Sequence, residues 1–195
     1  MNFFKHTPIY ALLIVASLFI YSCSKDDDAN GNNNSDTTIT VNDGRIAFDV
    51  SDFENTAMEG EVVYHLNNQY NIKYLKISLD EAIVLDDNIW RISIEQNSNE
   101  TLALPEPGEY PIVQGLTNTY NQDAFNATIS MHTDEMTDSG THFGGNNSEI
   151  NGTLTIVSNT DDVIKGTFSF EAYNPEGEKI TVTNGQFVAP ENSFW

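Results

Sequence analysis

Apolar and polar side chains alternate with a period of two along most of the chain beyond residue 44. Ile46, Phe48 and Val50, for instance, stand at every second position. Successive side chains of a strand point to opposite faces, so this pattern is typical of strands with one buried face. With further runs at 74–79, 90–95, 110–113, 125–131, 154–156, 168–172 and 180–182, it predicts about nine strands.

Residues that favour tight turns separate these runs. They are found at 105–108, 144–147, 151–152, 174–177 and 184–185. Short connections predict antiparallel neighbours and argue against a parallel sheet, which needs long crossovers. We therefore predict an all-β fold, either an antiparallel β-sandwich or a meander barrel, and a lipocalin-like barrel is one form of the latter.

The secondary structure of one segment is not determined by the alternation pattern. Residues 79–86 are apolar, with Asp80 and Glu81 near their start, and are compatible with one helical turn or with a loop. Eight residues are too few to decide between these alternatives.

The N-terminal segment 1–22 has the three parts of a secretory leader. A cationic start with Lys5 is followed by an apolar stretch at 9–20 and by the small Ser22. About 12 apolar residues are too few for a membrane-spanning helix, which needs about 20. We predict that residues 1–22 are a signal peptide that is removed.

The end of this leader, Ile-Tyr-Ser-Cys at 20–23, resembles the lipobox of bacterial lipoproteins. The resemblance implies that the Cys23 sulfur receives a diacylglycerol and that Cys23 becomes the mature N-terminus. The alternative is a buried free cysteine. The residues that follow it at 24–28 are polar or charged, and such residues are seldom buried in a core. Cys23 is the only cysteine, so no disulfide is expected and the domain must be held by its core.

The residues that follow Cys23 resemble sorting signals of Gram-negative lipoproteins. Ser24 replaces the aspartate that marks inner-membrane retention, and Lys25 with the aspartates at 26–28 resembles a surface-export signal of one phylum. A solvated charge run is the alternative. The resemblance implies an outer-membrane protein that faces the cell exterior. Anchor and disordered acidic tether would together span 23–43, followed by a single β domain at 44–195.

The last third of the chain also resembles a protein family. The segments 166–172 and 180–187, with Gly177 between them, look like the closing hairpin of single-domain β lipoproteins of the Bacteroidota type. Residues 107–110 and 152–156 fit the same pattern. This family has no agreed activity and no catalytic residues, so the resemblance implies a class and a location but no site.

The charge balance excludes one class of partner. The chain has 29 Asp and Glu against 8 Lys and Arg, a formal net charge of −21 at pH 7. Nucleic-acid binding requires a basic surface for the phosphate backbone, so no nucleic-acid partner is expected.

The histidines and carboxylates form no recognisable metal motif. His132 and His142 are ten residues apart across a Gly-containing segment, which is not the spacing of a zinc-binding helix, so unrelated exposed histidines are favoured. Asp134, Glu135 and Asp138 could bind calcium, but their order does not match the twelve-residue calcium loop. In so acidic a chain, such a cluster is expected by chance. We predict no metal and no cofactor.

No catalytic motif is present either. The chain lacks a Gly-x-Ser-x-Gly elbow and a phosphate-binding glycine loop, and the 29 acids do not single out a catalytic pair. Trp90 and the phenylalanines at 168, 170 and 187 are expected in the core. Some tyrosines could instead line a sugar-binding groove, and the candidates are Tyr64, Tyr70, Tyr74, Tyr110 and Tyr120.

Two classes of function follow. The chain is predicted to be a surface binding module for a glycan, a small apolar ligand or an envelope protein, and not an enzyme. The alternative is a hydrolase of extracellular polymers that uses a carboxylate pair. A barrel with a lined cavity would favour the small ligand, whereas a filled interior would favour a glycan or protein partner.

Overall fold

The structure is a computed structural model of the whole chain, in which Asp36–Trp195 forms one compact unit. The predicted signal peptide, Cys23 and the tether up to residue 37 lie outside the described residues. The structure describes residues 38–52, 56–69, 73–79, 83–85, 88–115, 123–132, 140–160 and 162–192.

Eleven strands and no helix are found in the described part of the chain, which confirms the all-β prediction. The strands are β1 (Arg45–Ser51), β2 (Thr56–Asn67), β3 (Lys73–Leu79), β4 (Ile83–Leu85), β5 (Asn88–Ser98), β6 (Gly108–Val113), β7 (Asn126–His132), β8 (Gly140–Gly144), β9 (Ile150–Thr160), β10 (Val163–Tyr173) and β11 (Lys179–Pro190). Ile83–Leu85 pairs with β5 as a short strand, so these residues do not form the helical turn that the sequence left open.

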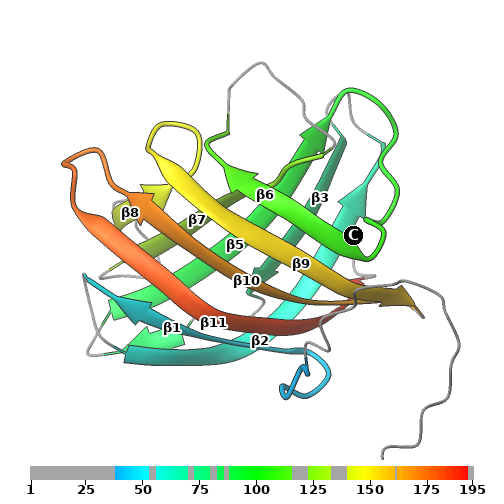
Figure 1. Cartoon of the computed structure of the whole chain (residues 1–195), viewed down its shortest axis with the longest axis horizontal. Helices are drawn as coiled ribbons and strands as arrows, with labels where there is room; N and C mark the ends of the chain where they lie inside the picture. Colours follow the sequence, from blue (N-terminus) through cyan, green and yellow to red (C-terminus); the bar gives the residue numbers. More distant parts are fainter. Residues whose placement is uncertain are drawn as a thin grey trace, which may run out of the picture. The chain divides into compact units, whose positions relative to one another are not determined.

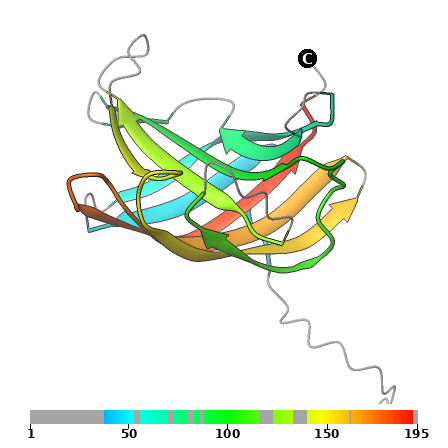
Figure 2. The ribbon, with the colours of Figure 1, turned by 90° about the horizontal axis from the view of Figure 1, so that it is seen from above.

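All eleven strands belong to one sheet, in the order β6-β9-β10-β11-β1-β2-β3-β5-β7-β8 with β4 beside β5. The sheet curls strongly, so that β9, β10 and β11 lie over β3, β5 and β7 (Figures 1 and 2). One end strand, β6, meets the residue before β7 at a short parallel seam, where the Val113 N–H donates to the Phe125 carbonyl (2.8 Å) and the Phe125 N–H to the Pro111 carbonyl (2.9 Å). The fold is therefore a curled half-barrel, which we call the barrel, and this seam joins β6 to the residues before β7.

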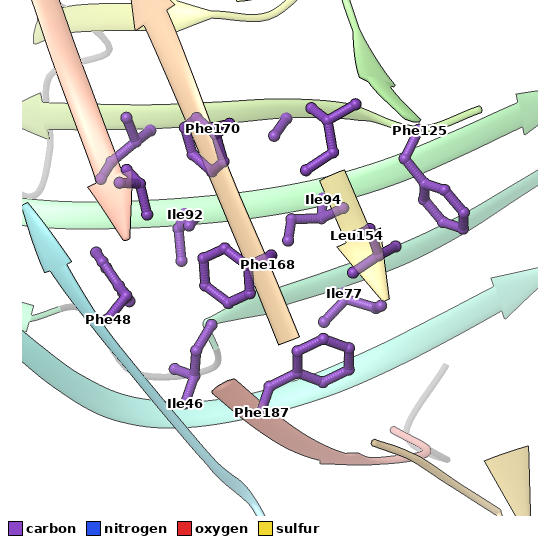
Figure 3. Close-up of a cluster of buried hydrophobic side chains, with 14 of the residues drawn as sticks. Ile46, Phe48, Ile77, Ile92, Ile94, Phe125, Leu154, Phe168, Phe170 and Phe187 are labelled. Carbon is purple, nitrogen blue, oxygen red and sulfur yellow. The ribbon is translucent and has the colours of Figure 1, made fainter. Parts of the chain in front are cut away.

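The interior of the barrel is filled by side chains. Trp90 is fully buried, and the Phe168 ring lies 6.0 Å from that of Phe48 and 6.3 Å from those of Phe170 and Phe187. This confirms the expected core residues. In Figure 3 the phenylalanines of β10 and β11 face the isoleucines of β3 and β5, and these side chains are Phe168, Phe170, Phe187, Ile77, Ile92 and Ile94.

Two predicted turns are instead parts of strands. The Asn-Gly pairs at 151–152 and 184–185 lie within β9 and β11. Both glycines point inward, as does a third one in β10, and each lies directly across from a phenylalanine of the neighbouring strand. The bare glycine backbone makes room for the aromatic ring, which the turn interpretation did not consider. The three pairs are Gly152 with Phe170, Gly166 with Phe187, and Gly185 with Phe168.

Candidate functional site

Because side chains fill the interior, the outer surface of the barrel is where a partner can be contacted. On β9, β10 and β11 this surface carries six short hydroxyl side chains, two from each strand. We call this surface the hydroxyl face. It consists of Thr153, Thr155, Thr167, Ser169, Thr181 and Thr183.

The strand register places these hydroxyls in rows across the sheet. Thr155 lies opposite Thr167, and Thr153 lies opposite Ser169. Neighbouring strands are about 4.8 Å apart, and residues two apart along a strand are separated by about 6.7 Å. The four hydroxyls of β9 and β10 therefore form an array of two rows. On β11, Thr181 lies opposite Glu171, after a register shift.

The core holds this array in position. Each hydroxyl residue alternates with an inward apolar residue, such as Leu154, Phe168 or Val182, none of which is more than 4% exposed. The backbone below the array is also tied into ladders on both sides. A ligand would thus meet an array that is already formed, which reduces the entropy lost on binding.

Most of these hydroxyls have no side-chain partner within the described residues. Thr181 is the exception, since its hydroxyl donates to the Asp52 carboxylate. The hydroxyls of Thr153, Thr155, Thr167 and Ser169 make no such bond in the part of the chain that the structure describes. They can both donate and accept hydrogen bonds with a ligand or with water.

At one end of the hydroxyl face, one lysine forms ion pairs with two carboxylates. Lys179 Nζ lies 3.3 Å from Asp52 and 3.2 Å from Glu171. The hydrogen bonds from Thr181 and Lys179 lower the pKa of Asp52, and those to Glu171 and Asp52 raise the pKa of Lys179. The eleven residues of β9 contain no charged side chain at all. The strand β9 therefore contributes no charge to the face, although Glu109 of β6 lies opposite Thr155 and Glu171 of β10 lies opposite Thr181.

The chain enters the barrel beside this face. The N–H and the hydroxyl of Thr40 both donate to Oε1 of Gln186, at 2.9 Å and 3.1 Å. Gln186 lies on β11 opposite Thr167 of the hydroxyl face. Thr40 is thus bound to the side of the barrel that carries the array.

The two histidines at 132 and 142 are not unrelated, contrary to the sequence interpretation. They lie on neighbouring strands β7 and β8, and their ring centroids are 5.3 Å apart. His132 is also 3% exposed rather than on the surface, whereas His142 is exposed. The ten-residue spacing hid this contact because it depends on the register of the β7–β8 hairpin.

The three described tyrosine candidates differ in burial. Tyr64 is 2% exposed, and burial raises its pKa to about 12, with a further contribution from Glu191 and Asp162. Tyr110 is half-buried, packs edge-on against Phe125 and donates its hydroxyl to the Glu106 carbonyl. Tyr74 is half-buried on β3. Tyr70 and Tyr120 lie outside the described residues.

The other sequence candidates lie outside the described residues. These are the lipid-anchor residue Cys23 and the proposed calcium ligands Asp134, Glu135 and Asp138. Within the described ranges, no three His, Cys, Asp or Glu side chains converge as a group that could hold a metal. The described residues also include no helix that is long and apolar enough to cross a membrane.

Comparisons with known proteins add no family to this description. No protein-family model, no curated protein and no solved structure matches the chain. The resemblance to surface lipoproteins thus stays a prediction from residues 20–28 and from the last third of the sequence.

Proposed function

We propose that this protein is a lipid-anchored binding module of the cell surface and that its hydroxyl face binds an uncharged glycan. The observation that carries this proposal is the array of hydroxyls on three neighbouring strands, together with the absence of charge on β9. Glycan hydroxyls are themselves donors and acceptors, and a neutral partner avoids the cost of desolvating charged groups.

The other candidate ligands receive less support. A small apolar ligand needs an interior cavity, whereas the described interior is occupied by phenylalanine and isoleucine side chains. A polymer hydrolase needs a carboxyl group whose pKa is raised so that it can act as an acid. Asp52 beside the hydroxyl face has a lowered pKa, which is the opposite shift.

The anchor belongs to the same proposal. Cys23 would carry the lipid, the segment before Thr40, which is bound to Gln186, would act as tether, and the acidic run at 26–28 would direct the protein to the exterior of the outer membrane. Negative charges at this place are also repelled by an anionic membrane, so the tether would extend away from the lipid.

Replacing Cys23 tests the anchor. A Cys23→Ala chain is expected to leave the membrane fraction while the barrel stays folded, because the lipid is attached outside the folded unit. Fractionation of cells with immunoblotting measures the distribution, and circular dichroism of the released chain measures folding. If Cys23→Ala still sediments with the outer membrane, the anchor is not at this residue.

Removing hydroxyls without changing shape tests the binding face. The double variant Thr155→Val/Thr167→Val keeps β-branched side chains and strand propensity but loses two hydroxyls from the centre of the array. At about 1 kcal/mol for each hydrogen bond, affinity for the glycan is expected to fall by about tenfold or more.

The measurement is binding of the full-length chain in detergent to an array of neutral and acidic glycans, followed by titration of the best binder. Thr160→Val, at the far end of β9, is the matched control and should bind like the wild type. Equal binding by the double variant would show that another surface is used. A preference for acidic glycans would contradict the charge argument.

A further inference from the structure

Gln186 extends one row of the hydroxyl face onto a third strand. Thr155 of β9 lies opposite Thr167 of β10, which in turn lies opposite Gln186 of β11. Directly opposed residues of an antiparallel ladder emerge on the same side of the sheet, so the Gln186 amide lies beside the Thr167 hydroxyl. At about 4.8 Å between neighbouring strands, this row is about 10 Å long. It therefore ends in a side chain that can both donate and accept hydrogen bonds.

The N-terminal segment occupies the acceptor of this amide. The N–H and the hydroxyl of Thr40 both donate to Oε1 of Gln186. A carbonyl oxygen has two lone pairs, so Thr40 uses the whole accepting capacity of the Gln186 side chain. The amide nitrogen Nε2 makes no hydrogen bond within the described residues. Thr40 thus stands where a glycan that follows the row would reach Gln186.

The contact with Gln186 is the only hydrogen-bonded attachment of residues 38–41 to the barrel in the described part of the chain. The backbone is first fastened at Gly44, whose N–H donates to the Val188 carbonyl (2.8 Å) and whose carbonyl accepts from the Val62 N–H (2.9 Å). Thr40 itself is exposed. Two hydrogen bonds between neutral, exposed groups favour the attached state by about 5- to 30-fold. A ligand that binds Gln186 more strongly can therefore displace Thr40.

We propose that Gln186 is a further glycan-binding residue and that Thr40 is an intramolecular competitor for it, which rests on the glycan binding proposed above for the hydroxyl face. With Thr40 attached, a glycan meets only the hydroxyls of the row. Only the fraction of chains with Thr40 released offers the complete site, which lowers the apparent affinity in proportion. Such coupling is reciprocal, so a bound glycan also detaches Thr40 and lengthens the proposed tether.

Thr40→Pro tests the competition, because proline removes both the N–H and the hydroxyl that donate to Gln186. The full-length chain in detergent is titrated with the neutral glycan that binds best on the array. Thr40→Pro should bind it at least about fivefold more tightly than the wild type. Thr38→Pro is the matched control and should bind like the wild type, since Thr38 makes no hydrogen bond within the described residues. Circular dichroism reports folding in each case.

Gln186→Ala tests the role of the amide and is measured in the Thr40→Pro chain, so that competition by Thr40 is absent from both members of the comparison. Loss of the amide should lower the glycan affinity by about fivefold or more. Gln69→Ala in the same chain is the control, because Gln69 is an exposed glutamine just beyond β2. It should leave the affinity unchanged.

Amide hydrogen exchange tests the attachment of Thr40 without a glycan. After correction for intrinsic exchange rates, the Thr40 N–H should exchange about 5- to 30-fold more slowly than the Thr38 N–H. Saturation with the glycan should remove this protection, because the ligand replaces Thr40 at Gln186. NMR spectroscopy resolves the two amides.

The outcomes distinguish failure of the competition from failure of the glycan site. An unprotected Thr40 N–H overturns the competition. Equal affinity of the wild type and Thr40→Pro does so too, while weaker binding by Thr155→Val/Thr167→Val would still support the glycan site. Unchanged affinity when Gln186→Ala is added to Thr40→Pro overturns the role of Gln186. Absence of binding to the array by both the wild type and Thr40→Pro overturns the competition and the glycan site together.

Discussion

Gly152→Ala should lower the free energy of unfolding by at least about 3 kcal/mol, at the upper end of what overpacking a core costs. A Cβ at this position would lie 2.2 Å from the Ser169 carbonyl oxygen and 2.4 Å from the Phe170 Cβ. These atoms belong to the adjacent strand and cannot rotate away, so β9 and β10 would have to separate. Urea unfolding monitored by circular dichroism measures the loss.

Gly108→Ala is the matched control for this substitution. Gly108 begins β6 of the same sheet, and the nearest atoms to a Cβ there are 4.0 Å away. Its free energy of unfolding should change by less than about 0.5 kcal/mol, as for most surface substitutions. If Gly152→Ala were as stable as Gly108→Ala, the close pairing of glycine with phenylalanine would be wrong.

Asn126→Asp is the second substitution with a large expected effect, since Asn126 joins three segments at the seam of the barrel. Its buried side chain donates from Nδ2 to the Val113 carbonyl (2.9 Å) and to the Gly145 carbonyl (3.0 Å). A carboxylate in this place has no proton to donate and faces two carbonyl oxygens. We expect a loss of about 3 to 5 kcal/mol, as for other buried charges without a partner.

Amide hydrogen exchange can locate this loss as well as measure it. The N–H groups of Val113 and Phe125 form the seam between β6 and the start of β7, and they should exchange much faster in Asn126→Asp. Asn147 is exposed in the connection between β8 and β9. Asn147→Asp adds the same charge and should leave the amides of Val113 and Phe125 protected from exchange. Unchanged protection in Asn126→Asp would mean that the seam does not depend on this side chain.

The packing inside the barrel is expected to affect the proposed glycan site on its outer surface. The hydroxyl face lies on the β9–β11 part of the sheet, whose curvature is set where glycines and phenylalanines pair across strands. A substitution such as Gly152→Ala should therefore disturb the array even though it changes no hydroxyl. Binding and stability must be measured together in every variant of this region.

The period-two pattern identified most strands because a half-buried strand is encoded locally. It missed β2, β4 and β8, and each omission has a physical cause. In β2 the inward series includes Gly60 between Met58 and Val62, so the run of apolar residues is interrupted. β4 has three residues, and β8 begins and ends with glycine, so neither is long enough to show a period.

The contacts of the candidate sites could not be predicted in the same way. The pairing of Thr155 with Thr167, and the contact of His132 with His142, both depend on which residues face each other across a ladder. A shift by one residue would move every side chain to the opposite face. Register is set by the whole sheet, so no local window of sequence contains it.

By itself, the sequence determined the class of fold and the acidic character that argues against nucleic acid, whereas the leader and its anchor at Cys23 stay predictions. Local alternation and composition carry these properties, because they depend on each residue and its near neighbours. The tertiary structure decided that β6 is bridged to Phe125, that apolar side chains fill the interior, and that the Asn-Gly pairs lie in strands. These features depend on packing between residues distant along the chain, where the fit of a phenylalanine over a glycine outweighs the local preference for a turn.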